Sequence, residues 1–179
     1  MQNFEERNKR KESSYTSTGE KILHHQEAVN NLRSRRNYPI VMHIMPTEKC
    51  NLKCIFCSVA NRGNAGKIFP DLSLDQIKFA VTSFKAIGLK AVILSGGGEP
   101  AMYSLINELL EYLYSENLEI GMISNGVQLD AKIKAKNLQS LTWLRISINS
   151  LDYLEDIDIP ALNTNQTTIG FSYIWNPLT

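Results

Sequence analysis

The chain of 179 residues has only three cysteines, no long hydrophobic run and almost no net charge. Nineteen Lys and Arg oppose eighteen Asp and Glu, which argues against a protein built to coat nucleic acid or an anionic membrane. The longest purely aliphatic run, Ala91 to Leu94, is far shorter than the ~20 residues that span a bilayer. Met1 to Lys11 is charged and lacks the apolar centre of a secretory signal, so a cytoplasmic location is predicted.

The few cysteines all lie between positions 50 and 57. A disulfide framework would spread an even number of cysteines along the chain, so this cluster of three indicates metal ligation instead. Cys50, Cys54 and Cys57 have the spacing C-x3-C-x2-C, directly after an expected strand. Three thiolates on one loop can bind three irons of a cubic iron–sulfur cluster, which normally takes four cysteine ligands. Because the sequence has no fourth cysteine, one iron would accept a small-molecule ligand.

A structural zinc site is the alternative interpretation of these cysteines. Tetrahedral zinc takes four protein ligands, so the fourth would have to be His24, His25 or His43. His43 falls on an expected buried strand, where a packed or hydrogen-bonded histidine is the commoner outcome. We therefore rank an open iron–sulfur site ahead of zinc, and both ahead of three cysteines that only fill a core.

The first 37 residues differ from the rest of the chain. They carry eight Lys and Arg against five Asp and Glu, and 1–19 is polar and dotted with Ser and Thr, as in a loosely attached arm. A helix is predicted over 20–33, and its basic end could contact an acidic partner. Residues 1–37 are thus a polar, basic arm, and 38–179 form the predicted domain.

From Tyr38 onward, short apolar runs alternate with helical patterns. Buried strands are predicted over Ile40–Met45, Ala91–Ser95, Glu119–Ser124, Trp143–Ile148 and Thr167–Ile174. Helices are predicted after the capping-box pair Ser73 and Gln76, along the stripe Leu105, Leu109 and Leu113, and after Asp130. This alternation predicts βαβ crossovers and a parallel sheet. The segment 149–166 has no helical stripe, so an irregular crossover is predicted there.

Four motifs together resemble those of the radical S-adenosylmethionine (radical SAM) enzymes. The cysteine segment is similar to the family signature C-x3-C-x-Φ-C, with Phe56 as the aromatic residue. Residues 95–100, SGGGEP, resemble the GGEP segment, and 124–126, SNG, resemble a TNG-like turn. Residues 145–149, RISIN, lie where the family often has S-x-D. The motifs occur in the family's order, each at or near an expected strand end.

The resemblance implies an α/β fold, an open partial (β/α) barrel of parallel strands. Five strands are present of the usual six, because the chain stops shortly after the fifth, and the core domain 38–179 is therefore expected to be incomplete at its C-terminus. Ligands would sit at the carboxyl ends of the strands, as in complete barrels.

The resemblance also implies the cofactors and the type of reaction. Cys50, Cys54 and Cys57 would bind a [4Fe–4S] cluster, whose fourth iron chelates S-adenosylmethionine. Reduction by a donor such as flavodoxin or ferredoxin would give a 5′-deoxyadenosyl radical that abstracts hydrogen from a peptide or small-molecule substrate. The hard chemistry belongs to the cofactor, so no catalytic side chain is predicted.

The residues implied to bind S-adenosylmethionine are Phe56, Gly97, Gly98, Glu99, Ser124, Ser147 and Asn149. The glycine carbonyls and Glu99 would receive the methionine ammonium, and the same segment could also form a tight strand-to-helix turn with glycines at positive φ, a role that can coexist with binding. Phe56 would pack on the adenine or fill the core beneath its loop.

The remaining implied contacts come from the third and fourth strands. Ser124 and Ser147 would donate to the methionine carboxylate, and Asn149, which replaces the usual Asp, would contact the ribose without a charge. Arg145 shares a strand face with Ser147, so it would reach the same carboxylate or point to solvent.

Two other functions stay open from the sequence. The first is a degenerate domain that binds the cluster or a nucleotide without turnover. The second is a zinc-stabilised interaction module that uses the basic arm as its binding surface.

Overall fold

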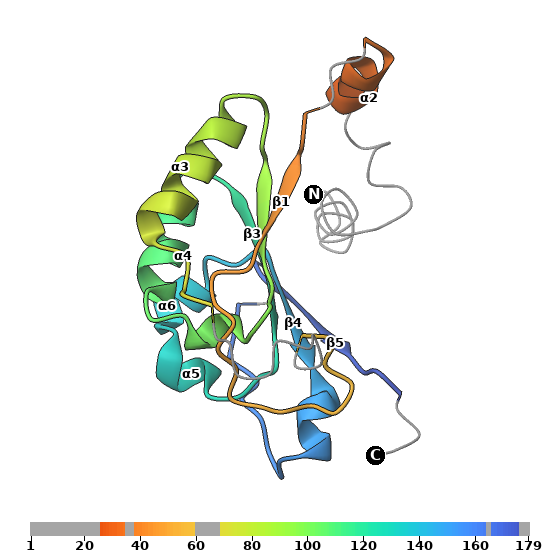
Figure 1. Cartoon of the computed structure of the whole chain (residues 1–179), viewed down its shortest axis with the longest axis vertical. Helices are drawn as coiled ribbons and strands as arrows, with labels where there is room; N and C mark the ends of the chain where they lie inside the picture. The colour runs from red at the N-terminus through yellow and green to blue at the C-terminus, as the bar shows by residue number, and fades with distance from the viewer. Residues whose placement is uncertain (1–25, 35–37, 60–68, 164–165, 176–179) are drawn as a thin grey trace.

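The structure is a computed structural model that describes residues 26–34, 38–59, 69–163 and 166–175 (Figure 1). The elements follow in the order α2 (Gln26–Arg33), β1 (Val41–Ile44), α3 (Leu74–Lys85), β2 (Ala91–Leu94), the 3-10 helix η2 (Pro100–Met102), α4 (Ile106–Ser115), β3 (Glu119–Ser124), α5 (Leu129–Lys132), α6 (Ala135–Leu138), β4 (Trp143–Ser147), the 3-10 helix η3 (Ile148–Asp152) and β5 (Thr168–Ser172). Helix α2 falls within the helix predicted over 20–33, whereas the rest of the predicted arm before residue 26 lies outside the described residues. No helix in the described part of the chain is long and apolar enough to cross a membrane.

All five predicted strands are present and form one parallel sheet in the order β1-β2-β3-β4-β5. Each strand pairs with the next strand in sequence, so the winding never reverses, whereas doubly wound sheets reverse and carry helices on both faces. Helices α3 to α6 lie together along one face of the sheet (Figure 1). Among the described residues the sheet is open, with β1 and β5 at its edges, and the predicted partial (β/α) barrel is confirmed.

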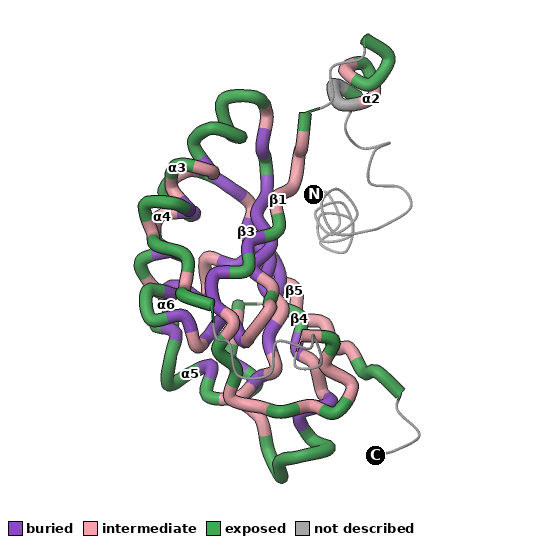
Figure 2. Tube along the Cα trace, viewed as in Figure 1, coloured by how far each residue is buried: buried purple, intermediate pink, exposed green. Residues whose placement is uncertain are grey.

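The hydrophobic core lies between the sheet and these helices (Figure 2). Alternate strand residues face the helices and join one buried cluster: Val92, Leu94, Ile120, Met122, Leu144 and Ile146. The helices contribute Ile77, Val81, Leu109, Leu110 and Leu113 to the same cluster. Because this layer is tightly buried, it fixes where each strand ends and therefore where the loops that follow the strands meet.

Helix α3 begins where the sequence predicts. The Ser73 hydroxyl accepts the Gln76 N–H (3.1 Å), and the Gln76 side chain accepts the Ser73 N–H (2.8 Å). This reciprocal pair satisfies two N–H groups that the first turn would otherwise leave without partners.

The single helix predicted after Asp130 is wrong, because the structure has two short helices there, α5 and α6. Between them Ile133 is extended, with φ −113° and ψ 125°. The side chain of Asn107, on α4, donates to the Lys132 carbonyl (3.0 Å) and accepts the Lys134 N–H (2.9 Å). Since this side chain takes backbone groups that a continuous helix would use, a tertiary contact divides the predicted helix.

The crossover predicted to be irregular over 149–166 is confirmed for its described residues. After η3 it contains no further helix or strand as far as residue 163. Gly126 accepts the Asp158 N–H through its carbonyl (2.8 Å), so the crossover is fastened to the end of β3.

Candidate functional site

The cysteine loop follows β1 and is anchored at its first residues by Asp71. The Thr47 hydroxyl donates to one carboxylate oxygen of Asp71 (2.7 Å), and the Lys49 ammonium donates to the other (2.9 Å). Thr47 also accepts the Lys49 N–H (3.0 Å). These donors hold the pKa of Asp71 below its usual value, with Lys49 as the larger cause. The backbone just before Cys50 is therefore fixed by a charged residue more than twenty positions further along.

The glycine segment after β2 lies directly against this stretch. The Gly98 N–H donates to the Thr47 carbonyl (3.0 Å), and the Glu99 N–H donates to the Lys49 carbonyl (2.8 Å). A Cβ at Gly98 would lie 2.1 Å from the Lys49 carbonyl oxygen, a distance that no side chain permits. Glycine is needed here for close approach of two backbones, because it carries no side chain.

Glu99 joins the loops that follow β2 and β3. Its carboxylate accepts the Ala101 N–H (3.1 Å) and the Ser124 hydroxyl (2.8 Å) on one oxygen and the Asn125 N–H (2.7 Å) on the other. The residue is 3% exposed, and this burial raises the pKa of its carboxyl group, while the three donors act in the opposite direction. The side chain thus has a structural function in the described structure, which corresponds to the turn role left open by the sequence.

Asn125, at the end of β3, reaches the cysteine loop. Its side-chain N–H₂ donates to the Asn51 amide oxygen (2.7 Å) and to the Cys50 sulfur (3.8 Å), and its amide oxygen accepts the Val127 N–H (2.9 Å). Sequence reasoning used Asn125 only as part of the SNG motif. The asparagine in this turn was the sequence signal that could have pointed to such contacts, because Asn side chains readily form hydrogen bonds with nearby backbone groups.

Tyr153 is a second residue that the sequence did not single out. Its hydroxyl, just after η3, accepts the Ile55 N–H (2.9 Å) in the middle of the cysteine loop. Nothing in the local sequence signals this contact, since the two residues are nearly one hundred positions apart.

Ser147 ends β4, whereas Asn149, expected in the fourth strand, lies on η3, and the two have different surroundings. Asn149 is 1% exposed, and its amide donates to the Ile174 carbonyl (2.9 Å) and to Asp152 (3.2 Å) while accepting the Ile174 N–H (2.7 Å). Asn149 therefore fastens the chain after β5 to η3. Ser147 is half-buried, and its hydroxyl has no partner among the described residues.

The three thiols are free and lie on one short loop. Cys50 is exposed, Cys54 and Cys57 are partly buried, and the Cys57 N–H donates to the Cys54 carbonyl (3.1 Å). Desolvation raises the pKa of the Cys54 thiol, and negative charge on Cys50 or Cys57 raises it further, so the three sulfurs lie close enough to influence one another. The pKa of Cys50 is raised in the same way, chiefly by desolvation.

These thiols are the kind of donor that an iron–sulfur cluster takes. No group of three His, Cys, Asp or Glu side chains in the described residues converges on a point where one metal ion could bind. In a cubic cluster each thiolate binds a different iron, and Cys50, Cys54 and Cys57 supply three thiols on one loop. His43, the nearest proposed fourth ligand for zinc, lies on β1 as predicted, but its side chain is exposed rather than buried. The buried role expected for it is wrong, because it projects from the face of the sheet opposite the helices.

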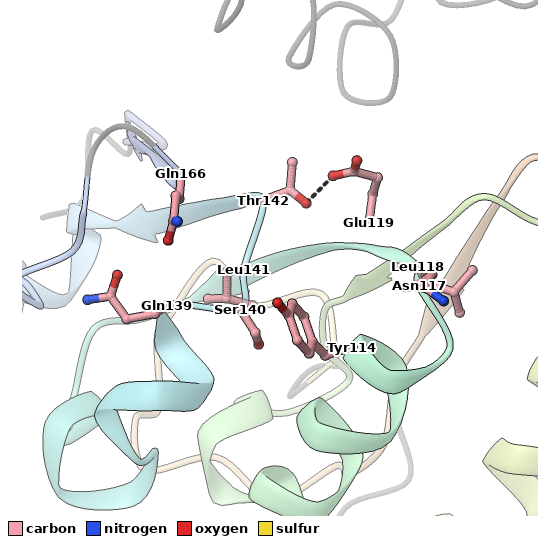
Figure 3. Close-up of a pocket in the computed structure, with 9 residues that line it drawn as sticks. All are labelled: Tyr114, Asn117, Leu118, Glu119, Gln139, Ser140, Leu141, Thr142 and Gln166. Carbon is pink, nitrogen blue, oxygen red and sulfur yellow. Dashed lines mark hydrogen bonds between the residues drawn. The ribbon is translucent and has the colours of Figure 1, made fainter.

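A pocket of about 350 Å³ lies elsewhere, at the amino ends of β3 and β4 (Figure 3). Its lining includes Glu119, Thr142, Gln139 and Gln166, and the Thr142 hydroxyl donates to the Glu119 carboxylate. The cysteine loop follows the carboxyl end of β1, at the opposite edge of the sheet. This pocket is therefore separate from the candidate site.

Comparison with known proteins identifies the class. The profile of the Radical SAM superfamily matches residues 44–164, which include the cysteine loop, the glycine segment and the ends of β3 and β4. The chain belongs to the radical SAM superfamily.

Relatives of known activity match part of their length. An S-adenosylmethionine-dependent nucleotide dehydratase of Selenomonas ruminantium is 28% identical over 144 residues, which are 79% of this chain and 50% of that protein. A GTP 3′,8-cyclase of Clostridium perfringens is 31% identical over 112 residues, which are 62% of this chain and 34% of that protein. The chain thus spans half or less of the length of these relatives.

Solved structures show the same fold at low identity. SuiB of Streptococcus suis bound to S-adenosylmethionine matches with a TM-score of 0.56 and 20% identity. The match covers 76% of this chain and 33% of the SuiB chain. BtrN in complex with AdoMet and 2-DOIA has a TM-score of 0.52 and 12% identity, covering 74% and 56%. At these identities the likeness concerns the fold.

Proposed function

We propose that this chain is the core of a radical SAM enzyme, in which Cys50, Cys54 and Cys57 hold a [4Fe–4S] cluster beside bound S-adenosylmethionine. The observation that carries the proposal is the meeting of three motif loops at one edge of the sheet. The glycine segment bonds to the backbone before Cys50, and Asn125 bonds to the Cys50 sulfur itself. When bound and reduced, the cluster would supply the electron that cleaves S-adenosylmethionine into methionine and a 5′-deoxyadenosyl radical.

The chain's own residues would hold and orient the cofactor. Among the described residues no donor is bonded to the carbonyls of Gly96 and Gly97, so these acceptors are available to the methionine ammonium. The Ser147 hydroxyl is available to the carboxylate for the same reason. Phe56, half-buried on the cysteine loop, would pack on the adenine, and the half-buried Gly98 would turn its carbonyl toward the ammonium with the other glycines.

Three of the proposed contacts compete with bonds inside the protein. Glu99 and Ser124 bond to each other, and Asn149 is bonded on both sides of its amide. We propose that these residues contribute to cofactor binding mainly by setting the positions of the loops. Their direct contact with ammonium, carboxylate or ribose would require exchange of an existing hydrogen bond.

The substrate is proposed to be a peptide or a small molecule, and the electron donor a flavodoxin or ferredoxin. Both substrate classes occur in the names of similar proteins. The relatives above are named for nucleotide substrates, and SuiB has been solved with the precursor peptide SuiA.

Anaerobic reconstitution with iron and sulfide tests the proposal. We expect about four irons per chain, the composition of a [4Fe–4S] cluster, and near zero after Cys50→Ala, Cys54→Ala or Cys57→Ala. Ser58→Ala, an exposed change on the same loop, is the matched control and should keep its iron. Reduction in the presence of S-adenosylmethionine should then release 5′-deoxyadenosine, measured by chromatography.

The possible outcomes separate the alternatives. A reconstituted chain that keeps its cluster but releases no 5′-deoxyadenosine would be a degenerate binding domain. A colourless chain that binds zinc stoichiometrically would be an interaction module. Iron retention in all three cysteine variants would contradict the cluster assignment.

A further inference from the structure

The face of the sheet opposite helices α3 to α6 carries an arginine stacked on a tryptophan. Arg145 lies between Leu144 and Ile146, which point into the helix-covered core, so its side chain projects from the other face. Its guanidinium carbon lies 5.5 Å from the centre of the Trp143 ring. Arginine is favoured over such rings because the planar cation is attracted to the aromatic face.

Trp143 is itself held flat against the sheet. Its neighbour in register on β3 is Gly121, where a Cβ would lie 2.2 Å from the indole ring. The indole therefore occupies the space above Gly121, and it is only 8% exposed. A side chain packed in this way gives the guanidinium a fixed support, so that less conformational freedom remains for Arg145 to lose on binding a ligand.

The cation on this support has no counter-charge in the described structure. No carboxylate among the described residues forms an ion pair or a hydrogen bond with Arg145. Glu119, on the same face of β3, precedes the register partner of Arg145 by four residues, roughly 13 Å along the strand, and is bonded to Thr142. On the other side the register partner is Gly170, and a Cβ there would have no atom within 4 Å. Open space thus lies beside an exposed, unpaired guanidinium.

The stacking also sets the position of the guanidinium along the strand. Trp143 precedes Arg145 on β4, so the contact directs the guanidinium toward the amino end of the strand. Ser147, proposed above to face the methionine carboxylate, lies in the opposite direction along the strand. Arg145 is therefore directed away from the cofactor loops, over the face of the sheet that the helices do not cover.

We propose that Arg145, supported by Trp143, binds an anionic group of the substrate, either a phosphate or a carboxylate. The planar guanidinium offers paired N–H donors that match both groups in a bidentate arrangement. Calling the bound molecule a substrate rests on the proposed function. The anion site itself requires neither the cluster nor S-adenosylmethionine. The anion site and the proposed function can therefore be contradicted independently of each other.

The test uses the full chain with Trp175→Phe, which leaves Trp143 as the only tryptophan. Inorganic tripolyphosphate and tricarballylate are titrated separately at constant ionic strength while Trp143 fluorescence is recorded. We expect a saturable change with at least one of them, which also distinguishes a phosphate from a carboxylate group. Arg145→Gln in this background should weaken the binding by about ten- to a hundredfold, as expected for a lost charge-assisted hydrogen bond. Arg145→Lys, which keeps the charge without the planar fork, should give an intermediate loss.

Arg33→Gln, an exposed change on α2, is the matched control and should bind like the parent. A titration with neither anion saturable, or equal affinities for Arg145→Gln and Arg33→Gln, would overturn the proposal. Calorimetry on the reconstituted chain adds a second criterion. Saturating S-adenosylmethionine should leave anion binding in place, and competitive displacement would assign Arg145 to the methionine carboxylate instead. Absence of 5′-deoxyadenosine would count against the proposed function and leave the anion titration valid.

Discussion

The side-chain amide of Asn125 donates hydrogen bonds to both the Cys50 sulfur and the Asn51 amide oxygen, at 3.8 and 2.7 Å. One residue at the end of β3 thus contacts a proposed cluster ligand and its neighbour on the loop after β1. Hydrogen bonds to ligand sulfurs are among the features that set the reduction potential of an iron–sulfur cluster.

Asn125→Ala is therefore expected to lower the reduction potential of the reconstituted cluster, because a donor to a ligand sulfur stabilises the more negative, reduced form. A redox titration followed by electron paramagnetic resonance measures the shift. Asn51→Ala is the control, since it removes the bond between the two amides and leaves the donor to sulfur in place. Equal potentials in the parent chain and in Asn125→Ala would show that the sulfur contact has no electronic effect.

Gly98→Ala is expected to separate the glycine segment from the cysteine loop. The new methyl group would overlap the Lys49 carbonyl at 2.1 Å, and the backbone would have to move. A cost of about 1–3 kcal/mol in the free energy of unfolding is expected for such overpacking, together with weaker S-adenosylmethionine binding. Urea denaturation and equilibrium binding provide the two measurements.

Gly170→Ala is the matched control for this change. Gly170 lies on β5, and a Cβ there would meet no atom within 4 Å. A methyl group at this position should therefore cause no clash. Its stability should equal or slightly exceed that of the parent. A similar loss of stability in both variants would mean that the close approach at Gly98 is unimportant.

Glu99→Gln should destabilise the fold more than Ser124→Ala. Both carboxylate oxygens accept a backbone N–H, so an amide at this position places an NH₂ group against one of those donors. A buried donor left without an acceptor costs about 1–3 kcal/mol. Glu99→Gln sets a backbone N–H against the new NH₂ group, so neither donor has an acceptor. Ser124→Ala leaves both backbone bonds of Glu99 intact and removes the acceptor of the Gly126 N–H alone (3.0 Å). Urea denaturation of the two variants at neutral pH compares them. If Glu99→Gln is as stable as the parent but binds S-adenosylmethionine about ten- to a hundredfold more weakly, the carboxylate acts on the ammonium instead.

Asp71 should make part of the stability dependent on acid pH. Its pKa is lowered in the folded chain by Lys49 and Thr47, so its contribution is complete above the unfolded value of 3.8 and is lost as the pH falls through the folded value. Asp71→Asn should lower the free energy of unfolding by about 1 kcal/mol at pH 7, since Lys49 is half-exposed and the pair is screened by solvent. The difference between the two chains should narrow in acid. A constant difference over the whole range would show that the carboxylate charge is not involved.

Local sequence patterns sufficed for much of the fold. Five apolar runs predicted five strands because a parallel strand covered by helices must bury its side chains, and the Ser73 and Gln76 pair predicted the start of α3 because capping depends on neighbouring residues alone. The division of the helix predicted after Asp130 into α5 and α6 was not predictable in this way. Its break depends on Asn107, which lies on another helix and reaches Lys132 and Lys134 only after the two elements pack.

The proposed cluster ligands could be named from sequence alone because C-x3-C-x2-C places three thiols on one loop whatever the rest of the chain does. The sequence by itself also determined the family, the parallel order of the strands and the edge at which the motifs gather. Only the tertiary structure decided which side chains have spare hydrogen-bonding capacity there. Glu99 and Asn149 are bonded internally whereas Ser147 is not, and Arg145 is stacked and unpaired. These differences arise from contacts between residues distant in sequence, whose distances and partners are set when the strands take up their register and the loops meet.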